Sequence, residues 1–508
     1  MRIGLGCLAA VGLAVATPAD AAWRKFETTH FIIYSESSDK RVKELATGLE
    51  SIDGLMRMAT GLPMDSEVVK VRIYEMADEG QVQAARSGDN EGVAGFYANN
   101  VLGPYAVTLR KAYSADGDFT AELVLHHEYA HHFMLQYFPA VYPPWYVEGF
   151  AELIGASKTL PDGKIAYGYP AKYRGEDISA VWVPVSDVLL KPPEKLYMDW
   201  YGQGWAMTHF FTFSKERAAQ LRQYLSALTA GKSSAEAAKA FGDLGELNRE
   251  SHVYISRGQF EYKPVKVPVR EPVIQRVMPV SAGEAAMIPE TIAFNDADLN
   301  EYRKAGDREI ERKKRAEVLD HIRRKAAQYA NDPYALYLLG EAEKASGNAA
   351  AAEQAVDRLL AIQPSNAGGM SLKSLLVAQR AMTMTGNARL QTAAEARRIA
   401  MAANKLDPDN PQTYVAFYQG FKATGAKVPA NAVEGLAVAV DKLPGDSGVR
   451  QMLVDEYAAE GQYGAAIAML IPIANDPHES PLRQAAREQL ATLQAKLAEQ
   501  RSGKKSGS

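Results

Sequence analysis

Cysteine is almost absent from this sequence, which contains only Cys7 among its 508 residues. Because Cys7 lies in a segment that we expect to be removed, the mature chain offers no thiol to a disulfide or a metal, and it suits an oxidising compartment. The chain also has no strong excess of positive or negative charge, since 57 basic and 61 acidic residues leave a net charge of -4. The sequence therefore predicts no nucleic acid partner and no attraction to an anionic membrane.

Long apolar runs are also missing beyond the first residues. Arg2, the apolar residues 3–16 and the small-residue exit Ala19-Asp20-Ala21 together predict a secretory signal peptide over residues 1–22. The apolar run is shorter than the roughly 20 residues that a membrane span needs. An uncleaved anchor is the alternative interpretation. We expect export across the inner membrane into the periplasm and no transmembrane span in the mature chain.

Length and composition predict more than one domain. A chain of 508 residues is too long for one core, and its 47% hydrophobic and 23% charged residues are typical of globular protein. Strand-like and helix-like patterns alternate after Trp23, which indicates an α+β arrangement. We predict an α+β domain over residues 23–265, a Pro-rich connector over 266–300, an all-α domain over 301–498 and a disordered tail over 499–508.

Histidines gather in one short stretch, residues 125–132, which holds four of the nine in the chain. Within it, His127-Glu128-x-x-His131 matches the H-E-x-x-H pattern of metal sites. On a helix, His131 lies about 40° and Glu128 about 100° round from His127, so the three side chains share one part of the surface. Two imidazoles can then bind one zinc ion with a carboxylate beside it. Catalytic zinc takes three protein ligands, so the pattern predicts a third ligand downstream.

Glu148 is the candidate for that third ligand. It lies 17 positions after His131 (148 minus 131), and Pro139, Pro143 and Pro144 interrupt the chain between them. The sequence therefore predicts two helices joined by a proline turn. The alternative for Glu148 and Glu152 is a solvated helix face, which like charges at i and i+4 make slightly unfavourable.

These motifs resemble those of a known family. The stretches are His127-Glu128-x-x-His131, Trp145-x-x-Glu148-Gly149-Phe150-Ala151-Glu152 and Tyr201-Gly202-Gln203-Gly204-Trp205, and they are similar to gluzincin metallopeptidases of the peptidase MA-like group, related to aminopeptidase N and thermolysin. The resemblance implies a zincin-like catalytic domain that binds Zn²⁺. It also implies roles for particular residues: zinc ligands His127, His131 and Glu148, general base Glu128, and Glu152 as the partner that orients a ligand histidine.

The chain departs from aminopeptidase N relatives in two ways. The spacing from His131 to Glu148 is slightly shorter, and the sequence has no Gly-Ala-Met-Glu-Asn type of motif for a free substrate amine. Endopeptidase action is therefore favoured over aminopeptidase action. In such chemistry Glu128 takes a proton from zinc-activated water and passes it to the leaving nitrogen. Tyr201 could donate a hydrogen bond to the oxyanion, with Tyr197 as its rival and a core aromatic role as the alternative for either.

The last third of the chain is repetitive. Gly347, Gly386, Gly425 and Gly461 recur at intervals of 39, 39 and 36 residues, between apolar-periodic and Ala-rich helical patterns. The unit around residues 334–364 resembles the tetratricopeptide pattern, so we predict an all-α tetratricopeptide-like domain. Its concave side is expected to bind a peptide or protein. The alternative is a helical bundle that only supports the catalytic domain.

Two functions follow from these patterns. The first is a secreted zinc peptidase whose repeats recruit a peptide or protein substrate or a partner. The second is a non-enzymatic periplasmic adaptor in which the repeats bind protein and the zinc site is structural or vestigial. Glu128 favours the first, because a structural zinc site needs no base.

Overall fold

The structure is a computed structural model. It describes residues 22–64, 69–85, 95–98, 103–110, 119–138, 140–175, 182–191, 201–295, 308–474 and 481–505. Most of the expected signal peptide, residues 1–21, lies outside the described residues, as does Tyr197. Within the described part of the chain, no helix combines the length and apolar character that a bilayer crossing requires.

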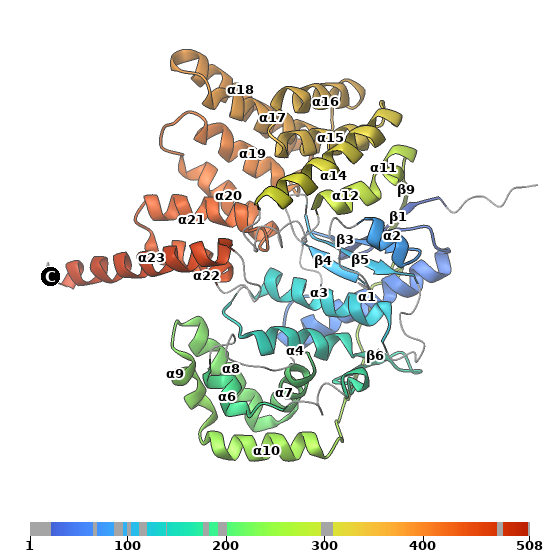
Figure 1. The fold of residues 1–508 in the computed structure, drawn as a ribbon, viewed down its shortest axis with the longest axis vertical. Coiled ribbons are helices and arrows are strands. Elements are labelled where there is room, and N and C mark those ends of the chain that lie inside the picture. The colour runs from blue at the N-terminus through green and yellow to red at the C-terminus, as the bar shows by residue number, and fades with distance from the viewer. Residues whose placement is uncertain are drawn as a thin grey trace, which may run out of the picture.

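A six-stranded mixed sheet forms the centre of the N-terminal region (Figure 1). Its order is β4-β5-β3-β2-β1-β9, in which β2, β3 and β5 run parallel and β4, β1 and β9 pair antiparallel to their neighbours. Side chains on successive positions of a strand point to opposite faces. The strands are β1 (Arg24–Glu27), β2 (Phe31–Ser35), β3 (Val71–Met76), β4 (Gly95–Ala98), β5 (Tyr105–Leu109) and β9 (Arg276–Pro279).

Both faces of this sheet are covered. On one face, Phe31, Ile33 and Ile73 pack against the long helices α1 (Asp39–Thr60) and α3 (Ala121–Tyr137). On the other, Tyr34, Tyr74 and Val107 pack against α2 (Glu79–Ala84) and α12 (Ile288–Asn295). The N-terminal region is thus α+β, as predicted.

A second group of helices follows the metal-motif helices. Helix α4 (Pro144–Gly155) packs on α7 (Gly202–Phe213), and Trp145 of α4 and Phe211 of α7 belong to one core. A small three-stranded sheet joins this group to the first core through Ile165. The remaining elements are β6 (Lys158–Thr159), β7 (Ile165–Tyr167), η1 (Lys172–Arg174), α6 (Val185–Leu190), α8 (Lys215–Thr229), α9 (Ser234–Ala238), η3 (Lys239–Phe241), α10 (Leu244–Ser256) and β8 (Lys263–Val265).

The C-terminal region is a helical repeat array, which confirms that prediction. Antiparallel helix pairs stack along it, on the opposite side of the sheet from the α6–α10 group (Figure 1). Side-chain oxygens cap the first helix of four successive pairs: Asp332, Asn366, Asn410 and Asp446. The helices are α14 (Arg308–Gln328), α15 (Pro333–Ala345), α16 (Ala349–Ile362), α17 (Ala367–Met382), α18 (Gly386–Leu406), α19 (Pro411–Lys422), α20 (Ala430–Lys442), α21 (Ser447–Ala459), α22 (Tyr463–Ala474) and α23 (Pro481–Lys505).

Two expected boundaries are wrong. The segment predicted as a Pro-rich connector supplies β9, which completes the sheet, and it continues into α11 (Ala282–Ala286) and α12. Proline is tolerated in β9 because β9 is an edge strand. The tail predicted from residue 499 is helical up to Lys505, since α23 buries Ala486 and Leu493 against α22 and continues past its last core contact.

The array is fixed to the sheet through α11 and α12. Lys25 of β1 forms a salt bridge with Glu284 of α11 at 2.8 Å, and Tyr34 donates a hydrogen bond to the same carboxylate at 3.1 Å. Thr291 of α12 shares a hydrogen bond with Tyr334 of α15 at 3.0 Å. These contacts join strand, linker helix and first repeat into one packed unit.

Candidate metal centre

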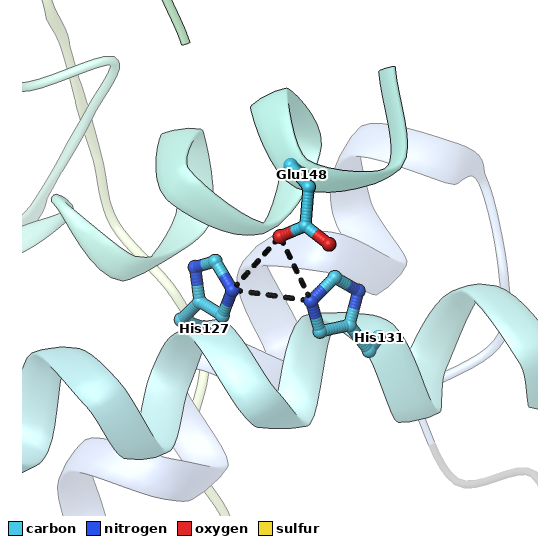
Figure 2. A group of neighbouring side chains, drawn as sticks. All are labelled: His127, His131 and Glu148. Atoms are coloured by element: carbon cyan, nitrogen blue, oxygen red, sulfur yellow. Dashed lines mark hydrogen bonds and ion pairs between the residues drawn. The ribbon is translucent and has the colours of Figure 1, made fainter. Parts of the chain in front are cut away.

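Two local sequence features place the candidate ligands. Thr120 caps α3 by accepting a hydrogen bond from the backbone N–H of Leu123 at 3.1 Å, so the helix is established one turn before the histidines. Helix α4 starts at Pro144, a residue whose fixed φ suits the first turn. The two predicted helices are therefore present, with Pro143 and Pro144 of the predicted turn at the start of α4, while Pro139 lies outside the described residues. The facing sides of the two helices carry His127, His131 and Glu148 (Figure 2).

The three predicted ligand atoms lie at the mutual spacing that zinc requires. The Nε2 atoms of His127 and His131 are 3.1 Å apart. Oε2 of Glu148 is 3.4 Å from the first and 3.5 Å from the second. On a tetrahedron, ligand atoms about 2.0–2.1 Å from zinc lie about 3.3–3.4 Å from one another. The residues present therefore fit a zinc ion held on three corners.

The charges around this triangle also suit a divalent cation. Four charged side chains lie close to the triangle and to Tyr201: Glu148, Glu128, Glu152 and Arg174. If the histidines are neutral, the three carboxylates and the one guanidinium give this group of side chains a net charge of -2. Buried charge is costly when it is uncompensated, and a divalent cation would balance this sum.

Protonation of a histidine can also balance part of this negative charge. Burial lowers the pKa of His127, but hydrogen bonds to Glu148 and Glu152 outweigh it and raise this pKa to about 10. Burial raises the pKa of Glu148, but hydrogen bonds from His127 and His131 hold it well below its usual range. The candidate ligands thus form an ion-paired cluster with one another.

Glu152 lies behind the triangle, where the resemblance implies it. Its Oε1 is 3.4 Å from Nδ1 of His127, the ring nitrogen that faces away from the candidate metal position. Arg174 donates to Oε1 at 2.8 Å, and the hydroxyl of Tyr173 donates to Oε2 at 2.6 Å. Burial raises the pKa of Glu152, but His127 and the hydrogen-bonded Arg174 together lower it to about 2. A permanent carboxylate at this place keeps a proton on Nδ1 and leaves Nε2 free for a metal.

The predicted catalytic residues flank the ligands. Glu128 is half-buried on α3, and its charge acts on both His127 and Tyr201. The ring of Tyr201 lies 6.0 Å from the ring of His127, at the residue just before α7, and 41% of the residue is exposed. Burial raises the pKa of Tyr201 to about 12, helped by the charges of Glu148 and Glu128. The phenol therefore stays protonated and can donate a hydrogen bond.

Two neighbouring histidines lie away from the triangle. His132 is buried, stacks on Tyr129 and shares a 2.8 Å hydrogen bond with Tyr97, so it connects α3 to strand β4. His126 instead lines a groove between α1 and the β6–β7 hairpin. The structure thus gives His132 a packing role, and it does not bring His126 to the site.

A second group of possible ligands has a cation already. Among the described residues, His30, Glu50 and Asp53 also bring ligand atoms within reach of one another. However, Asp53 pairs with the fully buried Arg57 at 2.6 Å and accepts a hydrogen bond from Tyr129 at 2.7 Å. Arg57 supplies the positive charge that a metal would add. We interpret this cluster as a buried ion-pair network that fixes α1 to α3.

Sequence reasoning missed the η1 turn. Tyr173 and Arg174 lie more than 20 residues beyond Glu152, in a stretch with no motif, and only the folded chain brings them to the site. An arginine next to an aromatic residue occurs too often to have indicated this role.

Comparisons with known proteins concern the fold only. No family model matches the chain, and no curated protein matches it. Among solved structures, a thermophilic TPR protein of Thermus thermophilus is 18% identical, with 39% of this chain and 99% of that chain covered and a TM-score of 0.31. MamA from Desulfovibrio magneticus is 19% identical, with coverages of 36% and 99% and a TM-score of 0.25. At these scores the matches carry no conclusion about the metal centre or about function.

Proposed function

We propose that this chain is a secreted, zinc-dependent endopeptidase of the gluzincin kind. The observation that supports it best is the triangle of His127 Nε2, His131 Nε2 and Glu148 Oε2, with sides of 3.1, 3.4 and 3.5 Å, which matches three corners of a zinc tetrahedron. A zinc ion with these three protein ligands would keep one coordination position for water. Glu128 lies beside the three ligands but is not one of them. A structural zinc site would close with a fourth ligand and needs no such carboxylate.

The chain's own residues divide the chemistry among them. Zinc held by His127, His131 and Glu148 would supply Lewis acidity and lower the pKa of a water molecule to near neutrality. Glu128, beside these ligands, would serve as the base that takes a proton from water and passes it to the leaving nitrogen. Glu152 holds His127 in the tautomer that presents Nε2. Tyr201, protonated because its pKa is raised to about 12, donates a hydrogen bond to the developing oxyanion.

The position of β4 supports binding of an extended peptide beside this centre. Among the described strands β4 lies at one edge of the sheet, and Tyr97 on β4 is hydrogen-bonded to His132 on α3. A substrate strand that adds to a sheet edge is held through its backbone, which favours cleavage of polypeptides over recognition of a chain end.

The test uses Glu128→Gln, which keeps size and hydrogen bonding but removes the base. We expect about one zinc per mature chain, retained in Glu128→Gln and largely lost in His131→Ala, together with a fall in peptide cleavage by a factor on the order of 10² to 10⁴ in Glu128→Gln. Metal analysis and turnover of a mixed peptide library at matched zinc occupancy measure both. Full zinc retention in His131→Ala, or wild-type cleavage by Glu128→Gln, would refute the assignment.

A second candidate function, peptide binding without cleavage, is favoured by a cleft between the array and the sheet. This cleft of about 910 Å³ lies where strands β2 and β3 begin, and its other wall comes from α15, α17 and the start of α19. Polar groups line it on both sides, including Arg72, Arg276, Tyr337 and Gln412. A helical array of this kind typically binds peptides. If zinc-loaded wild type binds library peptides and cleaves none, the adaptor function replaces the peptidase function.

A further inference from the structure

Arg174 contacts two groups of the metal centre at once. It belongs to the single 3-10 turn η1, which follows the β6–β7 hairpin. One end of its guanidinium donates from Nη2 to Oε1 of Glu152 at 2.8 Å, and its Cζ lies 4.8 Å from the centroid of the Tyr201 ring. Glu152 touches Nδ1 of His127, and the ring of Tyr201 lies 6.0 Å from the ring of the same histidine. Arg174 therefore bridges two residues that flank the candidate ligand His127.

The two partners of Arg174 differ in how far they are buried. The side chain of Glu152 is 1% exposed and also accepts from Tyr173 at 2.6 Å, but it carries a buried charge for which Arg174 is the permanent cation in contact. Tyr201 is 41% exposed and stands at the entry to α7. The guanidinium of Arg174 lies over its ring, an arrangement in which a cation attracts the ring and favours one orientation of it.

We propose that Arg174 is the positioning residue of this centre: it fixes the Glu152 carboxylate that orients His127 and holds the Tyr201 ring over the reaction site. The assignment rests on the proposed function for its second half only, since the Glu152 half concerns zinc affinity. Lysine could replace the salt bridge but not the stacked plane, because an ammonium group is a point charge. The two halves can therefore be separated by substitution.

The first experiment measures Zn²⁺ affinity by competition with a chelator, and it needs no activity. Arg174→Met removes the cation from Glu152, and disturbing a partner of this kind weakens metal binding by about 10- to 100-fold. We expect Arg174→Lys to bind zinc within a few-fold of wild type. Lys172→Met, a change to an exposed residue in the same turn, is the matched control and should leave the affinity unchanged. Thermal unfolding of each variant verifies that it is folded.

The second experiment measures kcat and KM for a library peptide in a double-mutant cycle. Arg174→Lys should lower kcat by roughly tenfold with little change in KM, the effect of losing part of an oxyanion donor. In a Tyr201→Phe background, which keeps the ring but lacks the hydroxyl, Arg174→Lys should cost nothing more. Such non-additivity is not expected of a merely structural residue.

The outcomes are distinct. Wild-type zinc affinity in Arg174→Met, or additive losses of kcat in the cycle, would overturn the positioning role. If wild type binds zinc tightly and cleaves nothing, the proposed function fails. The loss of zinc affinity in Arg174→Met would still support the Glu152 half in that case.

Discussion

The crossing of α4 and α7 at Gly149 offers a direct test of how the metal centre is supported. Gly149 follows the candidate ligand Glu148, and Gly204 lies three residues after Tyr201, so the contact between these glycines joins the two sides of the site. A Cβ added at Gly149 would lie 2.5 Å from the carbonyl carbon of Gly204, and still closer to its oxygen and to Thr208 Oγ1. A backbone carbonyl cannot rotate away, so Gly149→Ala forces the helices apart.

The size of the effect follows from two opposing contributions. Replacing glycine by alanine inside a helix stabilises it by about 0.5–1 kcal/mol. Overpacking a close contact costs about 1–3 kcal/mol. We therefore expect Gly149→Ala to lower the free energy of unfolding by about 1–2 kcal/mol. Moving α4 also displaces Glu148 from its distances of 3.4 and 3.5 Å to the histidines, so zinc affinity should fall by about tenfold or more.

Urea unfolding and chelator competition measure these two quantities, and Gly435→Ala is the control. Gly435 also lies inside a helix, α20, but a Cβ there meets only Cδ1 of Tyr414, at the ordinary contact distance of 3.5 Å. That variant should gain stability and bind zinc normally. If Gly149→Ala is as stable as Gly435→Ala, α4 and α7 do not cross as closely as described. If Gly149→Ala is destabilised but binds zinc as wild type does, the crossing does not position Glu148.

Two further predictions concern other parts of the chain. At the joint between sheet and array, a Cβ on Gly283 would lie 2.6 Å or less from the side chain of Asp332, which caps α15. Gly283→Ala should displace this cap and lower the free energy of unfolding by about 1 kcal/mol. If urea unfolding gives the variant wild-type stability, this prediction is contradicted. Burial lowers the pKa of His209 to about 4, and its Nε2–H donates to the Gly168 carbonyl at 3.0 Å while Nδ1 accepts from Tyr254 at 2.8 Å. Because the folded state prefers the neutral ring, this stabilisation is complete above about pH 6.5 and is lost as pH falls towards 4, by about 3 kcal/mol in all. Urea unfolding between pH 7.5 and 4 measures the unfolding free energy of wild type and of His209→Gln. The advantage of wild type over the variant should shrink as pH falls, and an advantage that does not change with pH would refute this role of His209.

The cluster of candidate ligands was predictable because its residues are close together in the sequence. His127 and His131 are one helical turn apart on α3, and Glu148 lies on the next helix, so the packing of two consecutive helices brings the three together. The repeat array was predictable for the same reason, since each helix pair contacts mainly its neighbours.

The features that the sequence did not indicate depend on contacts between distant segments. Strand β9 contains the pattern Arg-Val-Met-Pro, which is typical of a connector until its partner β1 is known. Arg174 reaches Glu152 only because the β6–β7 hairpin folds back on α4. The helical end of α23 could have been inferred from its helix-forming residues, but the Gly, Ser and Lys content of the terminus outweighed them.

The pairing of β1 with β9 has a consequence for how the chain assembles. Arg24 lies opposite Pro279, so the first strand of the sheet pairs with a segment that is synthesised roughly 250 residues later. Until that segment arrives, the outer edge of β1 has open backbone groups, which is the situation in which strands join the wrong partner. Closing so long a loop is slow, because chain entropy is lost before the contact forms. The folding of the N-terminal region is therefore expected to lag its synthesis and to finish only when α11 and α12 have docked on the sheet. The same step fixes the helical array to the sheet.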